Sequence, residues 1–62
     1  MNFSHIFQTL KREYLKSGDG LDAVRKIYMN YFNSGKFKAM DLRVLRRELF
    51  IMLDQIENRH NR

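Results

Sequence analysis

Apolar side chains in the first half of the chain recur every three or four residues, which is the spacing of one face of an α-helix. In the first stretch these positions are Phe3, Ile6, Phe7, Leu10 and Tyr14. In the second stretch they are Leu21, Val24, Ile27, Tyr28, Tyr31 and Phe32. The spacing predicts helices over residues 3–16 and 20–33. Asn2 or Ser4 is a candidate cap for the start of the first helix.

Short glycine-containing segments, residues 17–20 and 33–35, separate the predicted helices. Glycine readily adopts the left-handed conformation that closes a helix. At the start of the second helix, Asp19 and Asp22 have the spacing of a capping box built from carboxylates. Asp22 also precedes two basic residues by three and four positions, so it is placed to pair with Arg25 and Lys26.

A third helix is predicted over residues 39–58, after an extended link that contains Phe37. Its core positions are Leu42, Leu45, Leu49, Met52, Leu53 and Ile56. Short connections favour antiparallel neighbours, and no segment alternates with period two. We therefore expect a single all-α domain over residues 1–62, a small three-helix bundle, with residues 58–62 as a frayed polar tail.

Composition narrows the class of protein. With 62 residues the chain is one small domain, and with no cysteine it has neither a disulfide nor a thiolate metal site. Its longest apolar run, Leu49 to Leu53, is five residues. A signal peptide needs an apolar run of roughly 7–15 residues and a membrane span about 20. We expect a cytoplasmic protein that does not bind membranes.

The third helix carries apolar residues on two sides. Met40, Val44 and Ile51 fall roughly opposite its leucines. A surface helix usually has a single apolar stripe, and so small a protein would bury a second stripe only against another chain. The pattern favours a contact surface. The alternative is scattered surface hydrophobic residues, which are common and need no partner.

Between its two apolar sides the third helix carries a charged face that is basic in its first half and acidic in its second, with one aromatic residue between. This face consists of Arg43, Arg46, Arg47, Phe50, Asp54 and Glu57. This polarity opposes the helix dipole. An antiparallel copy crossing at Phe50 would set Arg43 against Glu57 and Arg46 against Asp54, which is the self-complementarity that a twofold dimer requires. The alternative is a solvated charged face with Phe50 tucked under a neighbouring element.

The same arginines support a second interpretation. The net charge is +5, and Lys36 and Lys38 precede Arg43, Arg46 and Arg47. A helix face with several cations could follow the phosphates of a nucleic acid. No asparagine or glutamine lies beside them to read bases. The charge of this face makes nucleic-acid binding the alternative to protein binding, although residues for base reading are missing.

Catalysis requires a nucleophile, a base and an orienting group in one cleft. The only histidines, His5 and His60, lie near the two ends of the chain. Asp54 and Glu57 resemble a carboxylate pair, but one helix face in so small a bundle offers no enclosed pocket for catalysis. No metal-ligand, phosphate-loop or dinucleotide motif occurs. We expect no enzymatic activity, no cofactor, no metal and no small-molecule substrate.

The sequence thus predicts a small non-enzymatic regulatory or adaptor protein that acts by protein–protein interaction. It would dimerise through the third helix and bind a protein partner, itself, or both. The predicted partner-binding residues are Met40, Arg43, Val44, Arg46, Arg47, Phe50, Ile51, Asp54 and Glu57.

Overall fold

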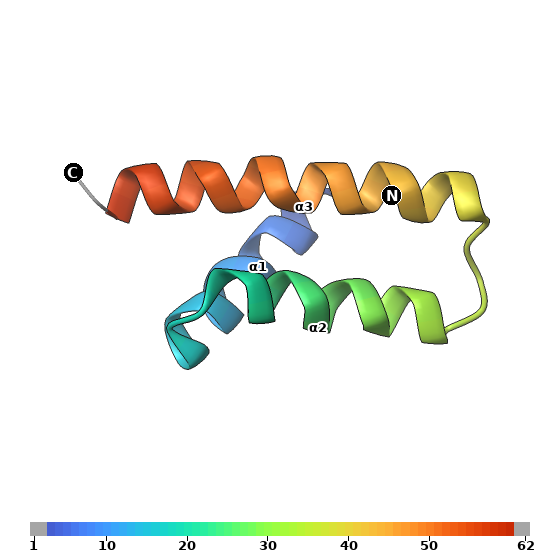
Figure 1. Cartoon of the computed structure of the whole chain (residues 1–62), viewed down its shortest axis with the longest axis horizontal. Coiled ribbons are helices and arrows are strands. Elements are labelled where there is room, and N and C mark those ends of the chain that lie inside the picture. The colour runs from blue at the N-terminus through green and yellow to red at the C-terminus, as the bar shows by residue number, and fades with distance from the viewer. Residues whose placement is uncertain (1–2, 61–62) are drawn as a thin grey trace.

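Three helices make up the fold in the computed structural model, which describes residues 3–60 and the side chains of residues 3–58. They are α1 (Phe3–Ser17), α2 (Gly20–Asn33) and α3 (Ala39–His60). Each helix packs against the other two. α2 and α3 run antiparallel, and α1 crosses them (Figure 1). The predicted all-α three-helix bundle is confirmed, with helix bounds that agree to within two residues.

The core lies where the three apolar stripes meet. Its buried residues are Ile6, Leu10, Ala23, Val24, Ile27, Leu42, Leu45, Leu49, Met52, Leu53 and Ile56. All six core positions predicted on the third helix are buried. On α2 the predicted positions Val24 and Ile27 are buried and Tyr28 and Tyr31 are partly buried. Leu21 and Phe32 are exposed instead, at 65% and 53%. They lie at one edge of the stripe, and the narrow contact between short helices does not reach them, whereas the small Ala23 is buried.

The predicted cap of α1 is not formed by Ser4. α1 begins at Phe3, so Ser4 already lies within its first turn. The other candidate, Asn2, lies outside the described residues.

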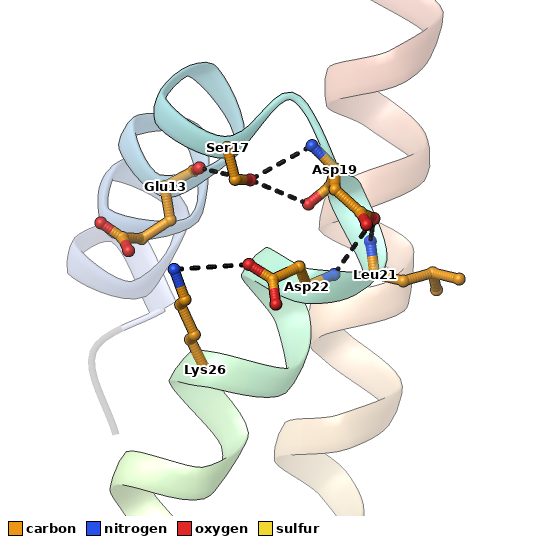
Figure 2. A network of polar contacts seen from close by, with 6 residues as sticks. All are labelled: Glu13, Ser17, Asp19, Leu21, Asp22 and Lys26. Atoms are coloured by element: carbon orange, nitrogen blue, oxygen red, sulfur yellow. Dashed lines mark hydrogen bonds and ion pairs between the residues drawn. The ribbon is translucent and has the colours of Figure 1, made fainter.

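The turn between α1 and α2 is closed by hydrogen bonds, and Figure 2 shows those that the side chains of Ser17 and Asp19 form. Gly18 adopts a positive φ of 69°, and its N–H donates to the Tyr14 carbonyl at 2.8 Å. Asp19 then caps α2, because its Oδ1 accepts from the N–H groups of Leu21 and Asp22 at 3.1 and 3.3 Å. Both the glycine closure and the aspartate cap are confirmed.

The second half of the capping box is not made. The Asp19 N–H donates to Ser17 Oγ at 3.1 Å instead of to Asp22 (Figure 2). The Asp22 carboxylate forms an ion pair with Lys26 Nζ at 3.3 Å, so of its two predicted partners it is ion-paired with Lys26 and not with Arg25. The N-terminus of α2 is thus capped mainly by one side chain, that of Asp19.

The link between α2 and α3 is held by packing. Gly35 has a positive φ of 70°, and Phe37 then packs against the core with its ring centroid 5.2 Å from that of Tyr31. At the start of α3 the Lys38 N–H donates to Asp41 Oδ2 at 3.4 Å. These contacts fix the direction in which α3 returns along α2.

Replacing Asp19 with alanine is expected to lower the free energy of unfolding by about 1 kcal/mol, the usual value of an N-cap side chain. Urea unfolding followed by far-ultraviolet circular dichroism measures the change. Gln8→Ala, at an exposed position of α1, is the matched control and should change stability little. Equal losses in the two variants would contradict the capping role.

Candidate interaction surface

A row of apolar side chains lies on the outer side of α3. Met40 is 77% exposed, and Val44 and Ile51 are 41% and 45% exposed. At about 100° per residue they fall on the side of the helix opposite Leu45 and Leu49, which are fully buried. The predicted second apolar side of α3 is therefore present, and this chain does not bury it. We call Met40, Val44 and Ile51 the outer row.

An open groove runs along α3 beside the outer row. It is lined by Arg43, Arg46, Arg47, Phe50, Ile51 and Asp54. Six of the nine predicted partner-binding residues thus come together on one surface. Phe50 is 41% exposed, so it is neither a core residue nor fully solvated, and part of it is accessible to a partner.

The arginines on this surface form no ion pair with a side chain that the structure describes. Among the side chains of residues 3–58 the structure has one ion pair, which joins Lys26 and Asp22 on α2. Arg43, Arg46 and Arg47 are all exposed and are not ion-paired with any described carboxylate. Their charges are therefore available to an external anion.

The two acidic residues of the predicted set behave differently from each other. Asp54 lines the groove and accepts a hydrogen bond from Asn58 Nδ2 at 3.3 Å. Glu57 is half-buried, and its Oε2 accepts from the Tyr14 hydroxyl at 3.4 Å. Glu57 thus serves the contact between α3 and α1 and does not line the groove. The sequence gives little sign of this because Tyr14 is distant in the chain.

A second groove, between α2 and α3, was not anticipated from the sequence. It is lined by Leu21, Val24, Arg25, Tyr28, Met29, Arg46 and Phe50. One feature of the sequence could have indicated this groove. The apolar stripe on α2 is wider than the surface that its two neighbouring helices cover. We call it the α2–α3 groove.

Side chains placed to bind a metal ion would lie together in a cluster. Among the residues that the structure describes, no three histidine, cysteine or acidic side chains lie close enough to hold a metal ion. His5 is an exposed residue of α1, and the side chain of His60 lies outside the described set.

Within residues 3–60, no helix combines the length and the apolar character that crossing a membrane requires.

Comparison of the chain with protein-family models, with curated proteins and with solved structures gave no match. Function is therefore inferred from the surface of the bundle.

Proposed function

We propose that this chain is a small non-enzymatic regulatory or adaptor protein of the cytoplasm that acts by protein–protein interaction and forms a homodimer through the outer side of α3. The observation that supports this most directly is the exposed outer row beside unpaired arginines. Burying apolar surface stabilises an association by roughly 25 cal/mol per Å². Arginine and aromatic residues are the types that most often dominate interface energetics.

The spacing of the outer row suits a twofold axis. Val44 and Ile51 lie at equal distances from the point midway between Arg47 and Glu48. An antiparallel copy of α3 centred on that point would set each Val44 against the partner's Ile51. The same two apolar contacts would then form twice, as an isologous interface requires.

The charges fit the same arrangement. Arg43 and Asp54 are eleven residues apart, which places them on the same side of α3. In the antiparallel pair, Arg43 would lie within about 3 Å along the axis of the partner's Asp54. We favour this register over one centred on Phe50, because that register would need Glu57, which already accepts a hydrogen bond from Tyr14.

Sedimentation equilibrium at low and at high salt tests the proposal. We expect a dimer under both conditions, because an apolar contact is not weakened by the screening that salt imposes on exposed charges. A dimer at low salt alone would keep the homodimer but overturn the apolar outer row as its main contact. A monomer at both salt concentrations would contradict the homodimer.

Nucleic-acid binding is the second candidate function, favoured by the exposed and unpaired Arg43, Arg46 and Arg47. It differs from the first in its response to salt. The logarithm of an affinity for phosphates falls linearly with the logarithm of salt concentration. Fluorescence anisotropy with labelled single-stranded and duplex oligonucleotides, measured over a range of salt, would reveal that slope. No measurable binding at low salt would exclude this function.

A further inference from the structure

The α2–α3 groove combines an apolar floor with a cation on each wall. Its volume is about 440 Å³, and only residues of α2 and α3 line it. On α2, Leu21, Val24 and Tyr28 follow one another at helical spacing. From Leu21 to Met29 the groove extends about 12 Å along the helix axis. This length corresponds to about two turns of a ligand helix lying in the groove.

The charge of the α2–α3 groove is wholly positive. Arg25 stands on α2 and Arg46 on α3, and no carboxylate is among the lining residues. Neither arginine is ion-paired with a described acid. The nearest acids, Asp19 and Asp22 at the start of α2, line an adjoining pocket with Leu21 and Arg25 and not the groove itself. Asp19 caps the helix, and Asp22 pairs with Lys26. Complementarity therefore requires negative charge in the ligand.

The walls favour a helical ligand. Both are α-helices, whose backbone groups are bonded internally, so an extended peptide would find no strand edge to pair with. An amphipathic helix instead packs its side chains between the ridges of two neighbouring helices. A second copy of this chain is a poor occupant, because its exposed apolar row lies beside Arg43 and Arg47, which Arg25 and Arg46 would repel.

We propose that the α2–α3 groove binds an acidic amphipathic helix of another protein. Apolar residues at positions i, i+3 or i+4, and i+7 of that helix pack on Leu21, Tyr28 and Phe50. Its flanking carboxylates form charge-assisted hydrogen bonds with Arg25 and Arg46.

This site goes beyond the homodimer and does not depend on it. Around the axis of α3, Phe50 lies about 100° from Ile51 and about 120° from Val44. Arg46 and Phe50 line both grooves, but a copy centred on Val44 and Ile51 does not cover the α2 wall, so the α2–α3 groove stays open. Each subunit of the dimer then presents its own groove.

The experiment selects binders from a display library of random 16-residue peptides and measures the affinity of the enriched peptides by fluorescence anisotropy. We expect acidic sequences with apolar residues at helical spacing. The double variant Arg25→Glu/Arg46→Glu should raise their dissociation constant at least about tenfold, the value of one lost charge-assisted hydrogen bond. Arg12→Glu/Lys16→Glu on α1 changes the net charge equally away from the groove and should have less than about a twofold effect.

Amide chemical-shift mapping with an enriched peptide locates the site. Changes at Leu21, Tyr28 and Phe50 support the proposal, and the Val44→Glu/Ile51→Glu variant should bind the peptide as the natural chain does. Equal weakening by both charge-reversal variants, shifts confined to the outer row, or enrichment of non-acidic sequences would overturn it. Failure to enrich any helical sequence would also overturn the proposal. The same holds if an oligonucleotide displaces the peptide and binds the Leu21→Ala variant as well as it binds the natural chain.

Discussion

Replacing Leu49 with alanine is expected to leave the protein largely unfolded at room temperature. Leu49 is fully buried, at a position on α3 that faces the other two helices. A buried Leu→Ala change costs about 2–5 kcal/mol, from lost apolar burial and from the cavity left behind. A core in a chain below about 70–80 residues rarely supplies more than 3–5 kcal/mol. The expected loss is therefore as large as the whole stability of the fold.

Far-ultraviolet circular dichroism and urea titration measure this effect, at a fixed protein concentration because dimerisation would add stability. Leu15→Ala is the matched control. It is the same chemical change on α1, where Leu15 is 72% exposed, and it should shift stability by no more than about 0.5 kcal/mol. A cooperative transition for Leu49→Ala close to that of the natural chain would contradict the position of the core.

The double variant Val44→Glu/Ile51→Glu is expected to abolish dimerisation while the helices remain. In the proposed interface each new carboxylate would face the partner's carboxylate, so both apolar contacts become like-charge contacts. We expect the dimer dissociation constant to rise at least about a hundredfold, equivalent to about 2.7 kcal/mol. Glutamate is a good helix former, and both positions are exposed in the monomer, so helicity should persist.

Sedimentation equilibrium gives the mass of this variant, and circular dichroism gives its helix content. The control Gln8→Glu/Leu15→Glu adds the same charge to exposed positions of α1. It should sediment like the natural chain. If both variants weaken the dimer equally, net charge and not the outer row controls association. If the α3 variant still forms a stable dimer, the contact lies elsewhere.

The sequence was sufficient to predict the helices and the core of α3. Helical periodicity is a local property, and every one of the six positions predicted for the α3 core is buried. The closures at Gly18 and Gly35 were also predictable, since both adopt the positive φ that glycine tolerates. The exposed outer row followed from the same periodicity.

Properties that depend on packing between helices could not be read in this way. The exposure of Leu21 depends on how far the contact between α2 and its neighbours extends across the helix surface. Glu57 meets Tyr14 across 43 positions of sequence. The α2–α3 groove exists only because Arg25 and Tyr28 on one helix lie beside Arg46 and Phe50 on another. Each of these three features depends on how two helices are placed relative to each other, and the apolar pattern of a single helix does not predict that placement.

The small core has a consequence for how long the protein persists in a cell. Within the described residues it consists of eleven buried side chains. A core of this size rarely supplies more than about 3–5 kcal/mol, and a small fraction of molecules is then unfolded at any moment and open to proteases. A ligand that binds only the folded state at a hundred times its dissociation constant adds about 2.7 kcal/mol. That is comparable to the stability expected of the bundle itself. Occupancy by a partner would therefore set the turnover of this protein, and its abundance would follow the supply of that partner.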